Sequence, residues 1–196
     1  MYSRWLSFAL SLLVSAPLFA LGFKAQVGAT LPEVSITGEH GGLVADGNAW
    51  DSKSLRGKLQ FLLYIDPDQH TLNDELIDRM EAEHFPRTEL GSAAIINLAA
   101  SWKPNSLIMP ILRSKQKRFP ATVYVFDKDR SIAKEWGLAA DGYHVVLLDQ
   151  DSKILFEKDG KLDKQEVENF ISLLRSKIQT LSSSSEEAGK EKKKSL

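Results

Sequence analysis

Runs of consecutive apolar residues mark the strands of this chain. Residues 59–65 (LQFLLYI) are almost entirely apolar and lie between Gly57 and Pro67. A run of this length between turn residues is typical of a strand that is buried on both faces. Residues 93–98, 122–126 and 144–149 repeat the pattern, and residues 154–157 follow across a DQDSK turn. The pattern therefore predicts five sheet strands, of which the last two form a hairpin.

Segments with a helical apolar period alternate with these runs. Residues 71–80 predict a helix that starts with a capping box of Thr71 and Asp74. The clearest helix is the last, where Asp163 and Glu166 form a second capping box. Its apolar positions then follow the 3.6-residue period, at Val167, Phe170, Ile171, Leu174 and Ile178.

Two further helices complete the pattern. Residues 107–112 predict one, in which Pro110 is tolerated only within the first turn. Residues 132–136 predict a short one that ends at Gly137. Because strands and helices alternate along most of the chain, the expected class is α/β, with a mixed sheet between helices on both faces.

The first 22 residues have the pattern of a secretory signal peptide. One basic residue, Arg4, precedes an apolar run, and small residues allow cleavage after Ala20 or after Gly22. An uncleaved membrane anchor is the alternative, but Pro17 and the lack of a flanking basic cluster favour export. We therefore expect a periplasmic protein, with no stable membrane insertion after cleavage.

The rest of the chain divides into one domain and a tail. Residues 23–181 suit a single globular domain, and residues 182–196 (SSSSEEAGKEKKKSL) are polar and of low complexity, so we expect them to be disordered. Loss of Arg4 with the signal peptide leaves 24 basic and 26 acidic residues, a net charge of −2. That balance argues against a nucleic-acid partner.

The chain contains no cysteine at all. Disulfides, thiolate metal sites and every mechanism that needs a thiol are therefore excluded. The four histidines form no H-x-x-x-H or His/Asp triplet, so neither a metal nor another cofactor is expected. The Asp-rich segments 127–130 and 149–152 lack the Gly and Glu of an EF-hand loop and are interpreted as turns.

The order of these motifs resembles a known fold. The stretch LRGKLQFLLYIDP, the hairpin VVLLDQDSKILFEKDG and the final helix are similar to the thioredoxin-like fold of TlpA-like and peroxiredoxin-like proteins. The segments VGATLPEVSI and RFPATVYVFDKDRSIAKEWGL more closely resemble the YtfJ family of exported bacterial proteins. The resemblance implies a thioredoxin-like three-layer sandwich of unestablished role. A transcription-regulator label sometimes attached to that family has no helix-turn-helix pattern here to support it.

The resemblance also implies where a redox centre would lie. Its C-x-x-C slot falls at residues 69–72, which read QHTL, and its cis-proline falls near Tyr143, where no proline occurs. Both halves of a thioredoxin-type centre are therefore missing.

What remains around that slot is a set of candidate ligand- or partner-binding residues. Asp66, Asp68, Gln69 and His70 precede a predicted helix and either line a cleft or form a solvated loop. Two aromatic residues complete the set. These are Tyr143 and Trp102, the latter interpreted as either a core residue or a binding-face aromatic.

Three functions follow from these observations. The first is a non-catalytic binding or interaction module with an unknown protein or small-molecule partner in the periplasm. The second is a cysteine-free hydrolase that uses Asp66, Asp68, His70 and His144 for acid–base chemistry. The third is transcriptional regulation, which rests on the family label alone, because acidic residues almost balance the lysines of the C-terminal segment.

Overall fold

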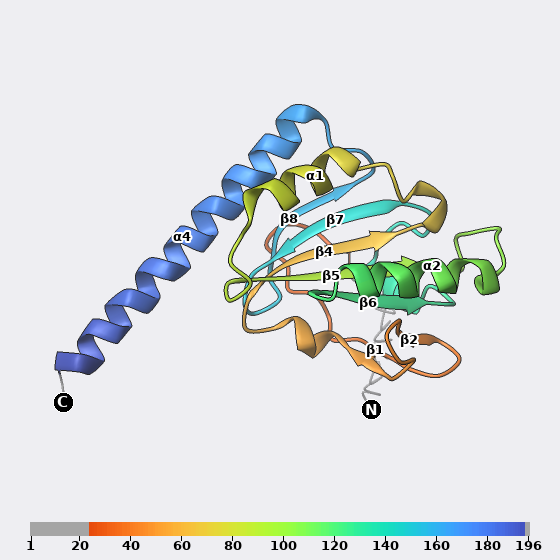
Figure 1. The fold of residues 1–196 in the computed structure, drawn as a ribbon, viewed down its shortest axis with the longest axis horizontal. Coiled ribbons are helices and arrows are strands. Elements are labelled where there is room, and N and C mark those ends of the chain that lie inside the picture. The colour runs from red at the N-terminus through yellow and green to blue at the C-terminus, as the bar shows by residue number, and fades with distance from the viewer. Residues whose placement is uncertain (1–23, 195–196) are drawn as a thin grey trace, which may run out of the picture.

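The computed structural model describes residues 24–194 and contains a six-stranded mixed sheet (Figure 1). The strand order is β2-β6-β5-β4-β7-β8. Three central strands are parallel, and they are β4 (Leu59–Ile65), β5 (Leu90–Asn97) and β6 (Thr122–Asp127). Antiparallel strands flank them, and they are β2 (Gly41–Leu43), β7 (Tyr143–Leu148) and β8 (Ile154–Asp159). A separate pair is formed by β1 (Ser35–Ile36) and β3 (Trp50–Asp51).

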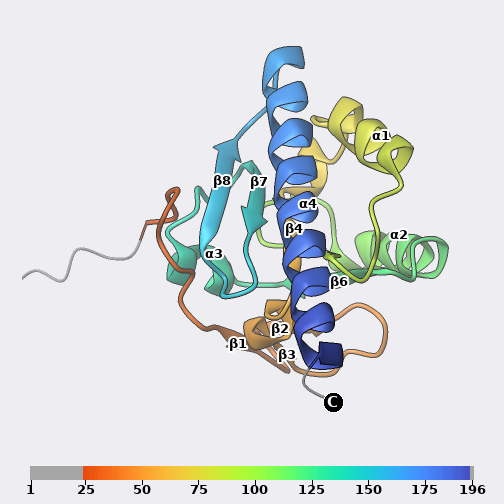
Figure 2. The ribbon, with the colours of Figure 1, turned by 90° about the vertical axis from the view of Figure 1, so that its left-hand side faces the viewer.

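Helices cover both faces of this sheet (Figure 2). One face carries α1 (Asp74–Glu83), α2 (Asn105–Arg118) and α4 (Lys164–Lys194). The other face carries α3 (Ser131–Trp136), the segment before β1 and the β1–β3 pair with the short helix η1 (Ser52–Leu55). The α/β three-layer sandwich predicted from the sequence is thus confirmed.

The central strand β4 explains why there are two cores. All seven of its residues are buried. Since successive strand side chains point to opposite faces, Phe61 and Leu63 enter the core under α1 and α4, while Leu62 and Tyr64 enter the core under α3. The sheet is therefore apolar on both sides, as its continuous apolar run predicts.

The start of α1 differs from the prediction. The helix begins at Asp74 and Thr71 lies in the preceding turn, so the capping box predicted at Thr71 is wrong. Asn73 precedes the helix, and its buried side chain connects α1 to the segment before α4. It accepts a hydrogen bond from the Leu162 N–H (2.8 Å) and donates one to the Gly160 carbonyl (3.0 Å). Tertiary contacts at Asn73 thus place the helix start.

The second helix also differs from the prediction. Pro110 lies at the sixth residue of α2, beyond the first turn, where its ring nitrogen has no hydrogen to donate. Ile108 and Leu112 are buried, whereas the side chains of Leu107 and Ile111 are 61% and 60% exposed. The apolar face of α2 is therefore wider than the face that the domain covers.

The last helix confirms its predicted start but not its predicted end. Asp163 and Glu166 form the capping box, with backbone-to-carboxylate distances of 2.9 and 2.8 Å. The helix then continues to Lys194, so residues 182–194 are helical rather than disordered. An existing helix extends without a new nucleus, and Glu, Lys and Ala favour that extension. Figure 1 shows this second half leading away from the sheet.

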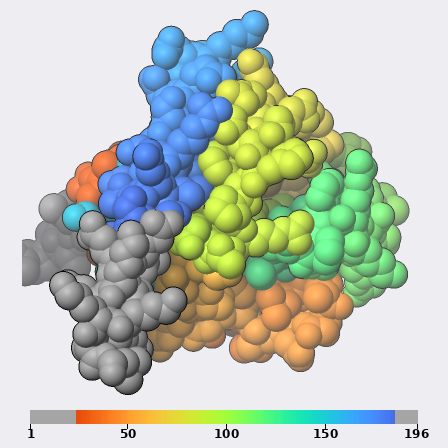
Figure 3. Space-filling model, turned by 60° about the vertical axis from the view of Figure 1, so that its left-hand side comes forward, coloured from red at the N-terminus to blue at the C-terminus, as the bar shows by residue number. Residues whose placement is uncertain are grey.

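Ion pairs connect the first half of α4 to α1. Figure 3 shows the surfaces of these two helices in contact. Glu83 accepts hydrogen bonds from Arg79 (2.6 Å) and from Arg175 (2.5 and 2.7 Å). The bond from Arg175, more than any other contact, lowers the pKa of Glu83.

The predicted signal peptide and its cleavage site lie outside the described residues. Within residues 24–194, no helix combines the length and apolar character that a membrane span needs.

Candidate functional site

A polar residue lies at the carboxyl end of each of the three parallel strands, along one edge of the sheet. Asp66 directly follows β4, and Asn97 and Asp127 are the last residues of β5 and β6. All three are buried. Each side chain accepts a hydrogen bond from the backbone N–H two residues later, over 2.9, 3.2 and 3.4 Å respectively. This edge, at the carboxyl ends of the strands, is where α/β sheets commonly hold ligands.

Asp127 has the most complete set of internal partners. Its carboxylate accepts hydrogen bonds from the Tyr64 hydroxyl (3.1 Å), the Ile132 N–H (3.0 Å) and the Ser131 N–H (3.1 Å), and the last two open α3. Burial raises the pKa of Asp127, and burial together with the neighbouring carboxylate raises the pKa of Tyr64. The carboxylate thus binds the first N–H groups of α3, and residues 128–130 form the bend between β6 and that helix.

The loop after β4 is held by an ion pair. Asp68 binds the Lys103 ammonium and accepts a hydrogen bond from the Ser101 hydroxyl (3.0 Å). The hydrogen bond from Lys103 is the main cause that lowers the pKa of Asp68. A carboxylate in this state is a weak base.

The loop before β7 closes the same edge. Gln69 donates its side-chain amide to the Asp141 carbonyl (2.8 Å), and the Asp66 N–H donates to the Gly142 carbonyl (2.9 Å). Arg130 joins a third loop, since its guanidinium donates to the Ala99 carbonyl (3.0 Å) and to the Asp141 carboxylate (2.8 Å). Loops that are far apart in the sequence are therefore locked together.

The aromatic candidates have opposite environments. Trp102 is 83% exposed, with the Lys103 ammonium 5.4 Å from its ring centroid, so it is not a core residue. Tyr143 is only 1% exposed and packs in the core below α1 and α4, so its side chain does not line this surface. His70 is exposed, and its Nδ1 lies 2.9 Å from the Pro67 carbonyl oxygen.

The hydrolase residues are not assembled into one site. His144 is 3% exposed, and its ring nitrogens lie 3.3 Å from Glu157 and 3.6 Å from Asp159, both on β8. It also packs against Tyr64 with ring centroids 6.3 Å apart. Its partners are thus other residues than Asp66, Asp68 and His70, and it is a buried core histidine.

Among the described residues, no group of three His, Asp or Glu side chains is placed to hold a metal ion. The same part of the chain contains no cis peptide bond. The segment 69–72, where a C-x-x-C would lie, forms the turn before α1.

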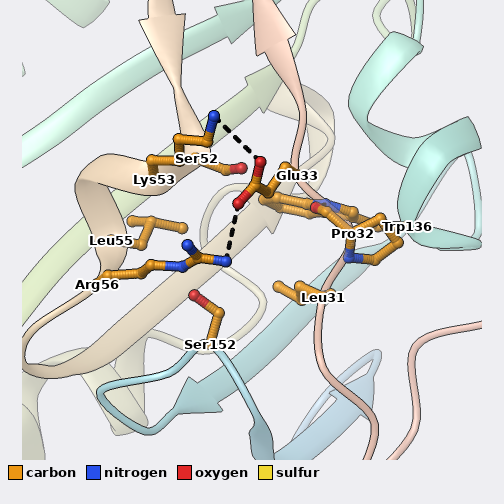
Figure 4. Close-up of a pocket in the computed structure, with 9 residues that line it drawn as sticks. All are labelled: Leu31, Pro32, Glu33, Ser52, Lys53, Leu55, Arg56, Trp136 and Ser152. Carbon is orange, nitrogen blue, oxygen red and sulfur yellow. Dashed lines mark hydrogen bonds and ion pairs between the residues drawn. The ribbon is translucent and has the colours of Figure 1, made fainter.

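Two hollows lie elsewhere on the domain. One, of about 10 Å³, is bordered by Trp136 and by Glu33, which pairs with Lys53 (3.1 Å) and Arg56 (2.9 Å) (Figure 4). It has room for about one water molecule at most. The other is a groove of about 810 Å³ on the face of α1 and α2, and the sequence reasoning missed it. Its signal in the sequence is the pair of small residues Ser92 and Ala94 in the middle of a buried strand.

Comparison with known proteins places the chain among uncharacterised relatives. A family model described as "Bacterial protein of unknown function (YtfJ_HI0045)" matches residues 25–177. The chain is 26% identical over 167 residues to "Uncharacterized protein YtfJ" of Escherichia coli (strain K12), an alignment that covers 81% of this chain and 90% of the relative. An "Uncharacterized protein" of Haemophilus influenzae is 26% identical over 157 residues, which are 76% of this chain and 85% of that protein.

Two of the solved structures with similar backbones are named as thiol proteins. A putative thiol:disulfide interchange protein DsbE from Chlorobium tepidum aligns with a TM-score of 0.54 and 14% identity, covering 78% of this chain and 98% of that chain. A thiol peroxidase from Chromobacterium violaceum aligns with a TM-score of 0.55 and 13% identity, covering 79% and 89%. At these identities the likeness shows the fold alone, and the fold is thioredoxin-like, as expected.

Proposed function

The chain belongs to the YtfJ_HI0045 family of bacterial proteins of unknown function, and we propose that it is an exported, non-catalytic protein-binding module. The observation that carries this proposal is Trp102, a large aromatic residue that is 83% exposed next to a loop held in place by an ion pair. Exposed tryptophans are costly to leave in water and are enriched at protein interfaces.

The chemistry of thiol relatives has no counterpart in this chain. It contains no cysteine, and the residues at the corresponding edge bind one another. A rigid edge of this kind suits a binding surface, because little conformational entropy is lost when a partner docks on it.

The proposed docking surface consists of Trp102, Leu107 and Ile111. Leu107 and Ile111 are one helical turn apart on the uncovered side of α2, and Trp102 lies in the loop that leads into this helix. The last turns of α2 carry only basic charges, on Arg113, Lys115, Lys117 and Arg118, and none of them forms an ion pair with a side chain of residues 24–184. The partner that fits is a protein with an apolar contact patch bordered by acidic side chains.

Location is the other part of the proposal. The pattern of residues 1–22 supports export to the periplasm, where the partner would then be found. Fractionation tests this directly: a chain shortened by 20 or 22 residues in the periplasmic fraction is expected, whereas a full-length chain in the cytosol would reopen the regulator hypothesis.

Site-specific photo-crosslinking in intact cells tests the docking surface. A crosslinking residue at Leu107 is expected to give one discrete adduct, and the same residue at Val27 is expected to give none. Val27 is a matched control because it is 64% exposed but lies beside β8, where the Gly28 N–H donates to the Ile154 carbonyl.

The adduct must also depend on Trp102. With the captured partner purified, Trp102→Ala is expected to raise Kd by roughly 30-fold, the effect of losing an interface hot spot of about 2 kcal/mol. Equal crosslinking at Leu107 and Val27, or a Kd that Trp102→Ala leaves unchanged, would overturn the proposal.

A further inference from the structure

The groove on the face of α1 and α2 has a structural cause. The helix α1 packs against α4, and α2 packs against β6, so the sheet between the two helices is not covered by either. The strand at that place is β5, which presents Ser92 and Ala94 on this face. Figure 1 shows α1 and α2 lying over the sheet with strands visible between them. Small side chains below a gap between helices leave a groove of about 810 Å³.

The lining of this groove is mainly apolar. Its floor is formed by strand residues, and its walls come from α1, from the segment between α1 and β5 and from the segment between α2 and β6. Phe61, Leu63 and Ala94 are among the apolar residues below, and Met80, Phe85 and Phe119 are among those at the sides. The volume and the lining are both those of small-molecule sites, which span about 300–1,000 Å³ and are largely apolar.

Cationic groups gather at one end of the groove. Lys58 directly precedes β4, Arg87 lies shortly before β5, and the Arg118 guanidinium lies 5.2 Å from the ring centroid of Phe119. Since β4, β5 and β6 are parallel, the segments that precede them meet at the same edge of the sheet.

The charges at this end are available to a ligand. The Lys58 ammonium donates to the Arg87 carbonyl (2.9 Å), which holds the two residues together. Among the side chains of residues 24–184, neither Lys58 nor Arg87 has an acidic partner. Glu81 is the acidic residue among the described groove-lining residues, and its charge acts on Tyr124, whose pKa is raised by burial and then by Glu81.

From the apolar floor and the cationic end we infer that the groove is a binding site for a medium-chain fatty acid. The acyl chain lies along the floor over Ala94, and the carboxylate binds Lys58 and Arg87. This site is separate from the proposed docking surface, and the inference does not depend on it.

Calorimetric titration of the purified full mature chain with dodecanoate and with dodecanol tests both halves of the site. We expect both ligands to bind, because both bury an apolar chain, and dodecanoate to bind more tightly. Lys58→Gln combined with Arg87→Gln is expected to raise the dodecanoate Kd by about tenfold, which is the effect of losing a charge-assisted hydrogen bond at an exposed site. The dodecanol Kd is expected to stay unchanged. Arg113→Gln is the matched control, since Arg113 is an exposed α2 cation outside the groove.

A second variant tests the apolar floor. Ser92→Leu is expected to fill the groove and abolish binding of both ligands, with an unfolding midpoint measured in parallel. If Ser92→Leu does not fold, the paired charge variants still decide the question. The absence of dodecanoate binding to the unaltered chain, or the same dodecanoate Kd in the paired variant and in Arg113→Gln, would overturn the inference. Trp102→Ala is expected to bind dodecanoate normally, so the two proposals can fail separately.

Discussion

The two ends of the parallel strands β4, β5 and β6 have opposite chemistry. At their carboxyl ends, Asp66, Asn97 and Asp127 are buried and each is satisfied by hydrogen bonds within the chain. Towards their amino ends, the groove between α1 and α2 is apolar and open, with Lys58 and Arg87 at its end. One edge is polar and closed, and the other is apolar and open.

This difference separates structural from binding features. Buried polar groups with complete sets of partners stabilise a fold and offer little to a ligand. Exposed apolar surface is in contact with water, and its burial by a ligand or another protein is favourable. The carboxyl-end edge is therefore a joint between loops, whereas the exposed apolar side chains lie on α2 and in the groove, which is why both of our proposals are placed there.

The largest loss of folding stability is expected from removing the Asp127 carboxylate at the closed edge. Asp127→Ala removes the acceptor for the Tyr64 hydroxyl and for the N–H groups of Ser131 and Ile132. Buried donors without a partner and a lost helix cap together cost about 3 kcal/mol in the free energy of unfolding. Urea denaturation measures this loss.

Asp46→Ala is the matched control for that variant. Asp46 accepts a hydrogen bond from the backbone N–H two residues later (2.9 Å), the same local contact that Asp127 makes, but it is exposed. We expect its loss to cost less than about 1 kcal/mol, because water replaces the missing acceptor. Equal losses in the two variants would show that burial at the closed edge contributes nothing.

A smaller effect, with a distinctive pH dependence, is expected from Tyr64→Phe. The tyrosine hydroxyl favours the ionised form of Asp127 and so lowers its pKa, against the rise that burial causes. Its removal raises the pKa of Asp127 further, and the destabilisation is about 1.5 kcal/mol where the carboxylate is ionised.

The sign of that pH dependence follows from proton linkage. A carboxyl group whose folded-state pKa lies above its unfolded value binds its proton more tightly in the folded state, so its contribution to stability grows as the pH falls. The difference in unfolding free energy between the unaltered chain and Tyr64→Phe is therefore expected to be largest at pH 7 and to shrink towards pH 4. Denaturation at both pH values measures it, and a constant difference would contradict the role assigned to the hydroxyl.

The sequence predicted those features that depend on local pattern. The continuous apolar run of β4, the capping box at Asp163 and Glu166, and the end of α3 at Gly137 were all readable, because each depends on residues within one element. The start of α1 was not readable, because Asn73 makes its hydrogen bonds to residues 87 and 89 positions later in the chain.

The candidate site was predictable only in part. Asp66, Asp68 and Gln69 do lie at the edge next to the loop before β7, as the fold resemblance implied. Neither the burial of Tyr143 nor the pairing of Asp68 with Lys103 could be predicted, since both depend on how separate loops meet. The groove was missed for the same reason, because it arises from the spacing of two helices over β5.

The smallest loss of folding stability is expected from breaking the exposed ion pair at the closed edge. Lys103→Ala removes the ion pair with Asp68, and only a small loss of unfolding free energy is expected because water and salt screen a pair that is partly exposed. The pKa of Asp68 should rise towards its usual value, since the hydrogen bond from Lys103 is the main cause of its lowering. Asp129 is the internal control: its pKa of about 2 depends chiefly on the Ser131 hydroxyl and should not move. Carboxyl NMR titration measures both groups, and an unchanged pKa at Asp68 would mean that the loops at this edge are held by contacts other than the ion pair.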